Sequence, residues 1–461
     1  MTLIKSISGI RGTIGGKVND ALTPIDAVKF AAAYGTWLQQ QNPGKRLKVV
    51  IGRDARISGP MIATLVQQTL IGLGIDVIDL GLSTTPTVEM AVPMEMAQGG
   101  IILTASHNPK QWNALKLLNE KGEFISGADG QMLLKIAEDE AFDFAEVDHL
   151  GHLLEDSSYM QKHIDAILAL PLVNKTAIEA ANFKIAIDAV NSTGGTFVPA
   201  LLRALGVKDI IELYCDPTGH FPHNPEPLPE HLTELSACVT EHGAHMGITV
   251  DPDVDRLALV CQDGSMFGEE YTLVAVADYI LKHTPGPTVS NLSSTRALRD
   301  ITENSGQRYA AAAVGEVNVV IKMKETGAVI GGEGNGGIIY PPLHYGRDSL
   351  VGIALFLSHL ALQKQSMTAL RASYPSYFIS KNKIDLAGGT DVDAILKAMA
   401  IRYASFEVDT TDGVKIYIEK EWVHLRKSNT EPIIRIYAES KDEASADLLA
   451  KKIMSEIKSL A

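Results

Sequence analysis

The feature that most constrains the fold is an alternation of short apolar runs, rich in β-branched residues, with longer helical patterns. Residues 47–54 (LKVVIGRD) predict a strand that runs into a polar loop, and residues 61–73 predict a helix. Residues 74–81 and 99–106 predict further strands. Strands that alternate with helices indicate layered α/β domains built on largely parallel sheets.

The same rhythm restarts at residues 183–195 and again at residues 287–295. Because 461 residues exceed what one hydrophobic core normally holds, we interpret the restarts as three similar α/β units in series. The end of the chain differs. Residues 415–440 contain three strand-like runs, and residues 442–460 form a helical pattern, which together predict a smaller α+β domain. The apolar stripe of that helix comprises Leu449, Ile453, Ile457 and Leu460.

Acidic and proline-rich stretches at residues 139–148 and 222–229 are candidate linkers or loops. With them as guides, we expect four domains. Their predicted bounds are residues 1–152, 153–252, 253–368 and 369–461.

Composition narrows the classes of partner. The formal charge of −14 comes from 55 acidic and 41 basic residues, which argues against a nucleic-acid binder that relies on a basic face. It is compatible with a small anionic substrate, because a few Arg and Lys side chains can make one local site positive.

The three cysteines lack CxxC spacing, which fits a reducing compartment and predicts no cysteine zinc site. The N-terminus has no apolar signal core, and the apolar stretch at residues 352–362 is too short to span a bilayer. We therefore expect a cytoplasmic protein with no membrane partner.

The motif TASHNP places Ser106 directly after an apolar strand, at the mouth of a sheet, where loops often carry function. The alternative is an ordinary turn. No GxSxG elbow surrounds Ser106, which makes a serine hydrolase a poor fit. His107 is adjacent in sequence, but adjacency does not make it the base for Ser106, and a lone histidine here is more often structural.

The motif DPDVDR holds Asp251, Asp253 and Asp255 at the end of a predicted strand. In an extended loop their carboxylates can converge on one hard cation such as Mg²⁺, although a solvated acidic turn is the simpler reading. An EF-hand is a poor match, because its sixth and twelfth positions would be Arg256 and Gln262. Arg256 would suit a phosphate or orient a carboxylate.

The glycine-rich segment at residues 331–337 (GGEGNGG) formally contains GxGxxG. A dinucleotide site needs a helix to follow, and two prolines within residues 338–346 argue against one. The remaining interpretations are a flexible loop that presents Glu333 and Asn335 to sugar hydroxyls, or a bare connection.

The segment RKSNTEPIIR combines guanidinium groups, hydroxyls and turn amides, which can form a phosphate cradle. A charged surface hairpin is the alternative. No GxxxxGK[ST] motif occurs, so a P-loop is not supported. The candidate phosphate ligands are Arg426, Ser428, Asn429, Thr430 and Arg435.

Taken in order along the whole chain, these motifs resemble the α-D-phosphohexomutase family. The matching segments are SGIRGT, GRDARISG, TASHNPKQWNALK, DPDVDR, GGEGNGG and RKSNTEPIIR. The resemblance implies three similar mixed-sheet α/β domains plus a C-terminal α+β domain around a central cleft. It also implies a Mg²⁺ cofactor, a hexose 1,6-bisphosphate activator, a small-molecule sugar phosphate as substrate, and a monomer or homodimer.

The resemblance further assigns roles to residues. Ser106 would carry the phosphoryl group, and the three aspartates would bind Mg²⁺ together with an oxygen of the phosphoserine. The reaction centre would be lined by Arg11, Lys116 and Arg256, with Lys116 either a general base or a fixed charge. The cradle at residues 426–435 would hold the non-reacting phosphate.

Two departures from the family pattern bear on the sugar. Asn335 and Gly337 stand where many members have Ser and His, and Ala114 rather than Gly follows Asn113. The GEGNGG loop resembles a phosphoglucosamine mutase-like branch, with phosphomannomutase and phosphoglucomutase as alternatives. Outside this reaction, the competing classes are a magnesium-dependent sugar phosphatase and a non-catalytic sugar-phosphate sensor.

Overall fold

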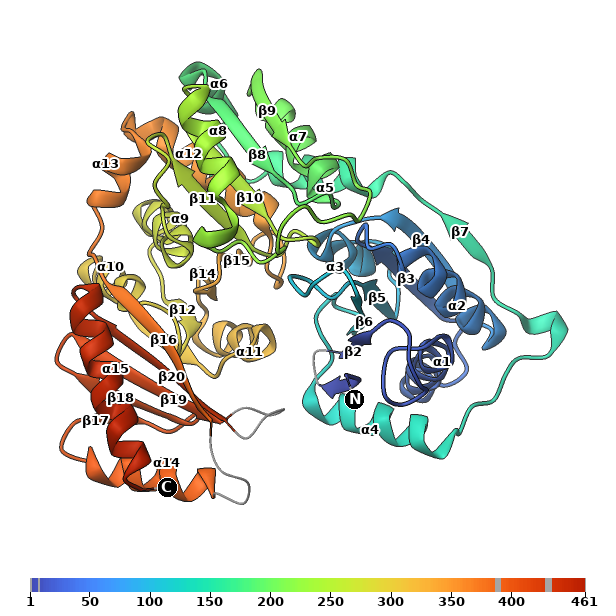
Figure 1. The fold of residues 1–461 in the computed structure, drawn as a ribbon. Helices are drawn as coiled ribbons and strands as arrows, with labels where there is room; N and C mark the ends of the chain where they lie inside the picture. Colours follow the sequence, from blue (N-terminus) through green and yellow to red (C-terminus); the bar gives the residue numbers. More distant parts are fainter. Residues whose placement is uncertain (1, 7–8, 386–390, 428–432, 461) are drawn as a thin grey trace. The chain divides into compact units, whose positions relative to one another are not determined.

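The computed structural model describes residues 2–6, 9–385, 391–427 and 433–460 (Figure 1). The chain forms two compact units. The first contains residues 1–272 and 335–368, and the second contains residues 273–334 and 369–461. No helix in the described ranges is long and apolar enough to cross a bilayer.

The first unit contains a seven-stranded sheet with the order β1-β2-β6-β5-β3-β4-β7. Strands β5, β3, β4 and β7 are parallel, whereas β1, β2 and β6 pair antiparallel. The elements are β1 (Ile4–Ser6), β2 (Gly9–Thr13), α1 (Pro24–Gln41), β3 (Lys48–Arg53), α2 (Gly59–Gly72), β4 (Asp76–Leu82), α3 (Thr85–Met94), β5 (Gly99–Leu103), β6 (Trp112–Leu118), α4 (Gly127–Asp139), η1 (Val147–His149) and β7 (Leu153–Glu155).

Side chains that alternate along the strands fill cores on both faces of this sheet. Val49 and Ile51 of β3 pack with α1, α2 and α4, while Val50 packs with α3 on the opposite face. All three are fully buried. Because helices cover both faces, functional side chains gather in the loops at the carboxyl ends of the strands.

A second sheet in the same unit has the order β11-β10-β8-β9, with β11 antiparallel to β10 and the other three strands parallel. Every residue of β10 is buried, so the acidic loop after it begins inside the protein. The elements are α5 (Tyr159–Leu168), α6 (Lys175–Ala181), β8 (Lys184–Asp188), α7 (Gly194–Ala204), β9 (Asp209–Leu213), η2 (Pro229–His231), α8 (Thr233–Glu241), β10 (Met246–Val250), β11 (Leu257–Cys261), β15 (Gly337–Ile339) and α12 (Ser349–Gln363).

In the second unit, β12 pairs in parallel with β13 on one side and with β14 on the other. The glycine-rich segment after β14 leads into a strand, β15, and not into a helix, which confirms that this loop lacks the context of a dinucleotide site. The elements are α9 (Glu269–His283), β12 (Thr288–Asn291), α10 (Arg296–Asn304), β13 (Tyr309–Ala312), α11 (Glu316–Thr326) and β14 (Ile330–Glu333).

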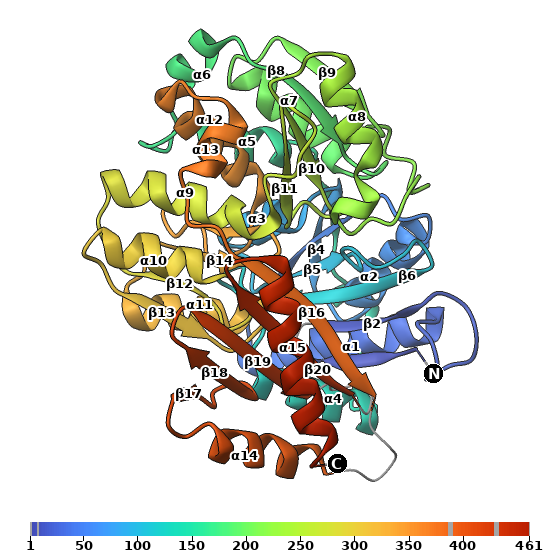
Figure 2. The same cartoon turned by 60° about the vertical axis from the view of Figure 1, so that its left-hand side comes forward.

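The C-terminal sheet is antiparallel throughout, with the order β16-β20-β19-β18-β17. Helix α15 lies across it (Figures 1 and 2), in contact with β16 and β20. The predicted apolar stripe is buried except for Leu460, which is 37% exposed. The elements are α13 (Met367–Ala372), β16 (Phe378–Asp385), α14 (Val392–Arg402), β17 (Glu407–Asp409), β18 (Val414–Ile418), β19 (Glu421–Lys427), β20 (Ile433–Ser440) and α15 (Glu443–Lys458).

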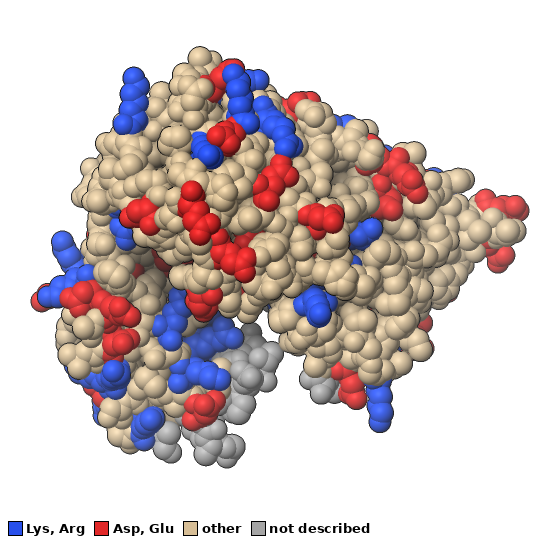
Figure 3. Space-filling view, turned by 45° about the horizontal axis from the view of Figure 1, so that its top comes forward, with Lys and Arg blue, Asp and Glu red and all other residues tan. Residues whose placement is uncertain are grey.

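Acidic and basic side chains are interspersed over most of the face shown in Figure 3. The formal charge of −14 therefore does not appear on this face as one continuous acidic surface. A site for an anionic ligand therefore depends on how particular cations are placed.

Candidate functional site

Ser106 lies three residues beyond the end of β5 and has a left-handed backbone with φ of 49°. This conformation is uncommon for a residue with a side chain, and such strain is typical of functional loops. Its hydroxyl donates a hydrogen bond to Asp251 Oδ2 at 2.6 Å. The serine predicted from TASHNP and the first aspartate of DPDVDR are therefore in direct contact.

The three predicted aspartates converge immediately after β10. One carboxylate oxygen from each of Asp251, Asp253 and Asp255 lies within 4.8 Å of the others, and all three residues are fully buried. Val254, between them, has a φ of 65°, which is strained for a β-branched residue. The loop thus holds a costly backbone conformation that brings three negative charges together.

These carboxylates fit a hard cation. Burial is the largest influence on Asp251, and together with the charges of Asp255 and Asp253 it raises the pKa of that carboxyl well above its usual value. The Oδ1 atoms of Asp253 and Asp255 are buried without a hydrogen-bond partner in the described residues. Converging acceptors with unused lone pairs are the donor set that Mg²⁺ prefers.

Two cations contact the aspartates directly. Lys116 Nζ lies 2.7 Å from Asp253 Oδ2 and 3.4 Å from Asp255 Oδ2, and Arg347 Nη2 lies 2.6 Å from Asp255 Oδ2. Burial alone would raise the pKa of Asp255, but Arg347 and Lys116 outweigh it and hold that pKa below the usual range.

Lys116 is a cation in this environment. Burial would lower the pKa of its amine, but Asp253 and Asp255 outweigh burial and raise the pKa above its usual value. An amine that stays protonated would act as a fixed charge, which is one of the two roles expected for Lys116.

His107 lies beside the same serine, and the charges of Arg256 and Arg11 act on His107. His107 Nδ1 lies 3.4 Å from Ser106 Oγ, and burial, followed by the charge of Arg256, lowers the pKa of the imidazole to about 2. Burial and Arg256 also lower the pKa of Arg11. Arg256 Nη1 lies 3.3 Å from Glu226 Oε1, whereas its Nε is buried without a hydrogen-bond partner in the part of the chain described. A neutral imidazole beside mutually repelling guanidinium groups suits an incoming anion.

Arg56, which the sequence analysis did not single out, organises the loop of Ser106. It is fully buried, its Nε lies 3.0 Å from Asp54 Oδ2, and its two terminal nitrogens donate to four backbone carbonyls. Those carbonyls belong to Ser106, Asn108, Pro109 and Trp112. Asp54 also accepts from Thr104 Oγ1 at 2.7 Å. The segment GRDARISG contains the signal, since a charged pair directly after a buried strand has to be satisfied internally.

Glu333 and Asn335, the residues expected to bind sugar hydroxyls, both have hydrogen-bond partners within the protein. Glu333 Oε1 accepts from Asn291 Nδ2 at 2.8 Å and from the Gly315 amide at 3.1 Å, and the residue is 4% exposed. Asn335 Oδ1 accepts from the Gly337 amide at 3.2 Å. These hydrogen bonds orient the side chains of Glu333 and Asn335.

Two of the C-terminal candidates lie on adjacent antiparallel strands. Arg426 of β19 and Arg435 of β20 are directly opposite each other across the two strands. Like charges at such positions repel, and an anion between them would remove the penalty. Arg426 Nε lies 2.8 Å from Asp412 Oδ2. Ser428, Asn429 and Thr430 lie outside the described residues.

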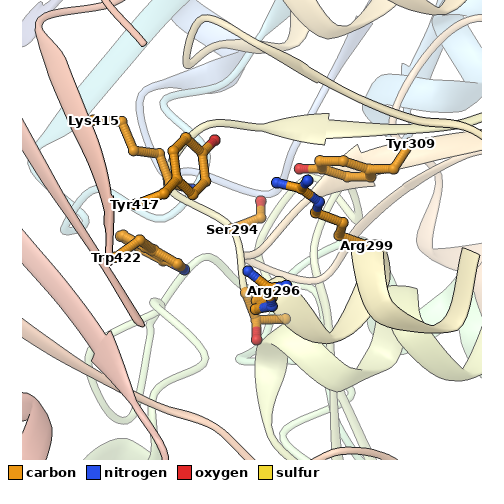
Figure 4. A pocket seen from close by; sticks show the side chains of 8 residues that line it. Ser294, Arg296, Arg299, Tyr309, Lys415, Tyr417 and Trp422 are labelled. Carbon is orange, nitrogen blue, oxygen red and sulfur yellow. The ribbon is translucent and has the colours of Figure 1, made fainter. Parts of the chain in front are cut away.

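A small polar cavity in the second unit is lined by aromatic and basic side chains (Figure 4). Its cations have structural partners. Arg296 and Arg299 pair with Asp300 and Glu303, and Lys415 Nζ lies 3.9 Å from the centroid of the Trp422 ring. We therefore interpret the cavity as part of the packing between the β12 sheet and the C-terminal sheet.

Comparison with known proteins identifies the family. Four phosphoglucomutase/phosphomannomutase domains match the chain, namely α/β/α domains I, II and III at residues 3–144, 161–264 and 268–377, and the C-terminal domain at residues 381–456. The phosphoglucomutase/phosphomannomutase of Thermococcus kodakarensis is 33% identical over 442 residues, which cover 94% of this chain and 95% of that protein. The phosphoglucosamine/phosphogalactosamine mutase of Sulfurisphaera tokodaii is 31% identical over 452 residues, with coverages of 96% and 97%.

A crystal structure of a phosphoglucomutase/phosphomannomutase family protein from Burkholderia thailandensis matches with a TM-score of 0.85 at 26% identity, covering 100% of this chain and 98% of that one. The chain belongs to the phosphoglucomutase/phosphomannomutase family. It is an isomerase of the phosphohexomutase type, in a magnesium-dependent family, and it has the acidic cluster that such a metal requires.

Proposed function

We propose that this protein transfers a phosphoryl group between the 1- and 6-positions of a hexose through a phosphoserine at Ser106 and a hexose 1,6-bisphosphate intermediate. One observation carries the proposal. The Ser106 hydroxyl, on a strained left-handed backbone, is hydrogen-bonded to one of three fully buried, converging carboxylates.

Asp251, Asp253 and Asp255 are the residues that would hold Mg²⁺, with an oxygen of the phosphorylated Ser106 as a further ligand. When bound, Mg²⁺ neutralises charge on the transferring phosphoryl group. Lys116 and Arg347 would hold the carboxylates of Asp253 and Asp255 in place through their 2.7 Å and 2.6 Å contacts.

Phosphoryl transfer demands mainly positioning and charge balance from the protein. A phosphoserine brings roughly −1.5 to −2 charges at neutral pH, which would repel a sugar phosphate unless cations offset it. Arg11 and Arg256 would supply that charge. The Nε of Arg256 supports this role, because it is buried without a hydrogen-bond partner among the described residues and could donate to an anion. His107 is neutral and lies within 3.4 Å of the serine hydroxyl, where it would help orient it.

The chemistry balances in two transfers. A free hydroxyl of the bound hexose phosphate attacks the phosphorus on Ser106, the bond from phosphorus to Ser106 Oγ breaks, and the proton of the attacking hydroxyl ends on Ser106 Oγ. The product is the 1,6-bisphosphate. After it turns around, Ser106 Oγ attacks the other phosphate, the bond from that phosphorus to the sugar oxygen breaks, and the serine proton ends on the sugar oxygen. This releases the isomeric monophosphate and restores the phosphoenzyme. A hexose 1,6-bisphosphate would likewise activate an unphosphorylated enzyme.

The non-reacting phosphate would be bound by the C-terminal hairpin. The facing Arg426 and Arg435 support this role, because a dianion would compensate two opposed guanidinium groups. Glu333 and Asn335 would bind the sugar hydroxyls. The further ligands proposed from the sequence are the hydroxyls of Ser428 and Thr430 and the amide of Asn429.

For the sugar, we propose glucosamine phosphate. The GEGNGG loop and a relative named phosphoglucosamine/phosphogalactosamine mutase support this choice. Glucose and mannose phosphates are the second candidates, because the relative at 33% identity is named phosphoglucomutase/phosphomannomutase.

The test follows phosphorus NMR of the protein with Mg²⁺, a trace of hexose 1,6-bisphosphate and, in turn, glucosamine, glucose and mannose 6-phosphates. We expect a sugar 1-phosphate, formed fastest from glucosamine 6-phosphate and absent with Ser106→Ala. Ser158→Ala, at an exposed serine of the same unit, is the matched control. Free phosphate as the sole product would instead indicate a phosphatase, and no turnover with any sugar would favour a sensor.

A further inference from the structure

A second cluster of ionisable side chains in the first unit has no role in the proposed reaction. His163 lies in α5, and His344 and Asp348 lie just before α12. Asp348 Oδ2 is 2.9 Å from His163 Nε2 and 3.3 Å from His344 Nε2. One ligand atom from each of the three residues falls within 4.8 Å of the others. The side chains of His163 and Asp348 are 1% and 0% exposed, so the cluster is internal.

The outer atom of each of these side chains is also held. His163 Nδ1 is 2.9 Å from Thr87 Oγ1, and His344 Nδ1 is 3.5 Å from Glu89 Oε2. Asp348 Oδ1 accepts hydrogen bonds from the amides of the second and third residues of α12, Leu350 and Val351. Both Nε2 atoms therefore face one shared carboxylate oxygen, while outer partners fix the ring orientations, as occurs around histidine-ligated metals.

The loop before α12 is shaped around this arrangement. A Cβ on Gly346 would lie 1.8 Å from Glu89 Oε2 and 2.8 Å from His344 Cε1, so only glycine leaves room for the carboxylate to reach the ring. Glu89 and Asp348 are both buried. The buried carboxylate of Asp348 needs compensating positive charge, which a divalent cation between the imidazoles would provide.

We propose that His163, His344 and Asp348 bind one Zn²⁺ ion or a similar divalent transition metal, with Thr87 and Glu89 as outer partners. Imidazole nitrogen and carboxylate oxygen are zinc ligands, and tetrahedral bonds of about 2.0–2.1 Å place ligand atoms roughly 3.3 Å apart. The distance of 3.3 Å between His344 Nε2 and Asp348 Oδ2 already matches this value. The distance of 2.9 Å between His163 Nε2 and Asp348 Oδ2 would have to increase by a few tenths of an ångström when the metal binds.

Such an ion would tie α3, α5 and the start of α12 together. Two neighbouring residues connect these segments to the acidic loop, since Thr85 Oγ1 donates to Asp253 Oδ2 at 2.5 Å and Arg347 contacts Asp255. The metal would therefore hold in place the segments whose residues, Thr85 and Arg347, contact the acidic loop. This ion would be distinct from the Mg²⁺ that the three aspartates would bind.

The test uses Co²⁺ as a spectroscopic probe of the full chain, with excess Mg²⁺ present to occupy the aspartates. We expect one equivalent of Co²⁺ to give the intense visible bands of tetrahedral nitrogen and oxygen coordination, and Zn²⁺ to displace it. His163→Gln and His344→Gln should abolish the bands, and Thr87→Val should weaken binding about 10- to 100-fold. His149→Gln, at an exposed histidine of the same unit, and Asp251→Asn should leave the bands intact.

Bands that are absent, or that survive both histidine substitutions, would overturn the proposal and leave the cluster as a hydrogen-bonded network. Bands lost only in Asp251→Asn would place the ion at the aspartates and also overturn it. Should the histidine variants fail to fold, anomalous diffraction at the zinc edge from wild-type crystals decides the matter. A peak among the three ligand atoms supports the site, and its absence overturns it.

Discussion

Replacing Arg56 by methionine tests how the loop of Ser106 is held. Methionine keeps much of the side-chain volume but removes the charge and all the donors. The carboxylate of Asp54, fully buried, would lose its cation, although Thr104 Oγ1 and the amide of residue 56 would still bond to it. Four carbonyls between residues 106 and 112 would lose their donor at the same time.

The expected cost is large. Removing one partner of a buried ion pair typically costs about 3–5 kcal/mol, against a domain stability of about 5–15 kcal/mol. Replacing Asp54 by asparagine in the same chain removes the uncompensated buried charge and should recover part of the lost stability. The double variant R56M/D54N should therefore be less destabilised than the sum of the single variants, by about 1–3 kcal/mol.

Urea unfolding followed by tryptophan fluorescence measures this, since Trp37 and Trp112 both lie in the first unit. Hydrogen exchange of the peptide around Ser106 should rise in R56M beyond its rise elsewhere. Arg53→Met, at the last residue of β3, is the matched control. Arg53 donates to the backbone carbonyl of Asp54, and the loss of its side chain should cost about 1 kcal/mol or less. If R56M costs no more than Arg53→Met and turnover stays within twofold, Arg56 does not hold the loop and the reasoning is wrong.

Three further predictions concern charge. Lys116→Arg should retain more activity than Lys116→Gln and should leave the shape of the pH–rate profile unchanged. The reason is that a raised pKa keeps the Lys116 amine protonated, so that it acts as a fixed cation. A change in the pH–rate profile of the arginine variant, with loss of one limb, would show that Lys116 acts as a base. Asp253→Asn should raise the Mg²⁺ concentration needed for half-maximal turnover at least tenfold, and an unchanged metal dependence would disprove its place in the metal site. Burial raises the pKa of Glu439 from 4.5 to about 7, so the stability tied to its neutral form is present below pH 4.5 and is lost as pH rises through 7. Trp422 donates a hydrogen bond to Glu439, and the urea midpoint of unfolding that its fluorescence reports should fall between pH 4.5 and pH 7 by the equivalent of up to about 3 kcal/mol. Glu439→Gln should make this midpoint less dependent on pH. A wild-type midpoint that does not change with pH would contradict the assignment.

The parts of the fold and site that the sequence predicts are those with local causes. Apolar runs mark β3, β5 and β10, and polar motifs directly after such strands identify Ser106 and the aspartates. The residues that complete the site come from far along the chain. Arg56 contacts a carbonyl 53 residues away at Pro109, and Arg347 contacts Asp255 across 92 residues. Spacing cannot reveal such contacts, because the chain topology brings them together.

The C-terminal domain shows the same limit. Strands β18, β19 and β20 follow from three apolar runs. Strand β16 has a single buried residue, Ile384, and no continuous apolar run. Its strand conformation therefore depends on antiparallel pairing with β20, because its own sequence lacks the apolar pattern of a strand. The cross-strand register also reveals that Arg426 faces Arg435, which the hairpin sequence alone leaves open.

The most direct test of the central claim is whether Ser106 itself carries the phosphoryl group in turnover. The protein is incubated with Mg²⁺ and hexose 1,6-bisphosphate, desalted, and mapped by peptide mass spectrometry before and after a chase with glucosamine 6-phosphate. We predict a single phosphate on Ser106 that leaves during the chase and appears as sugar bisphosphate. A phosphate on another residue, or turnover that persists in Ser106→Ala, would contradict the account.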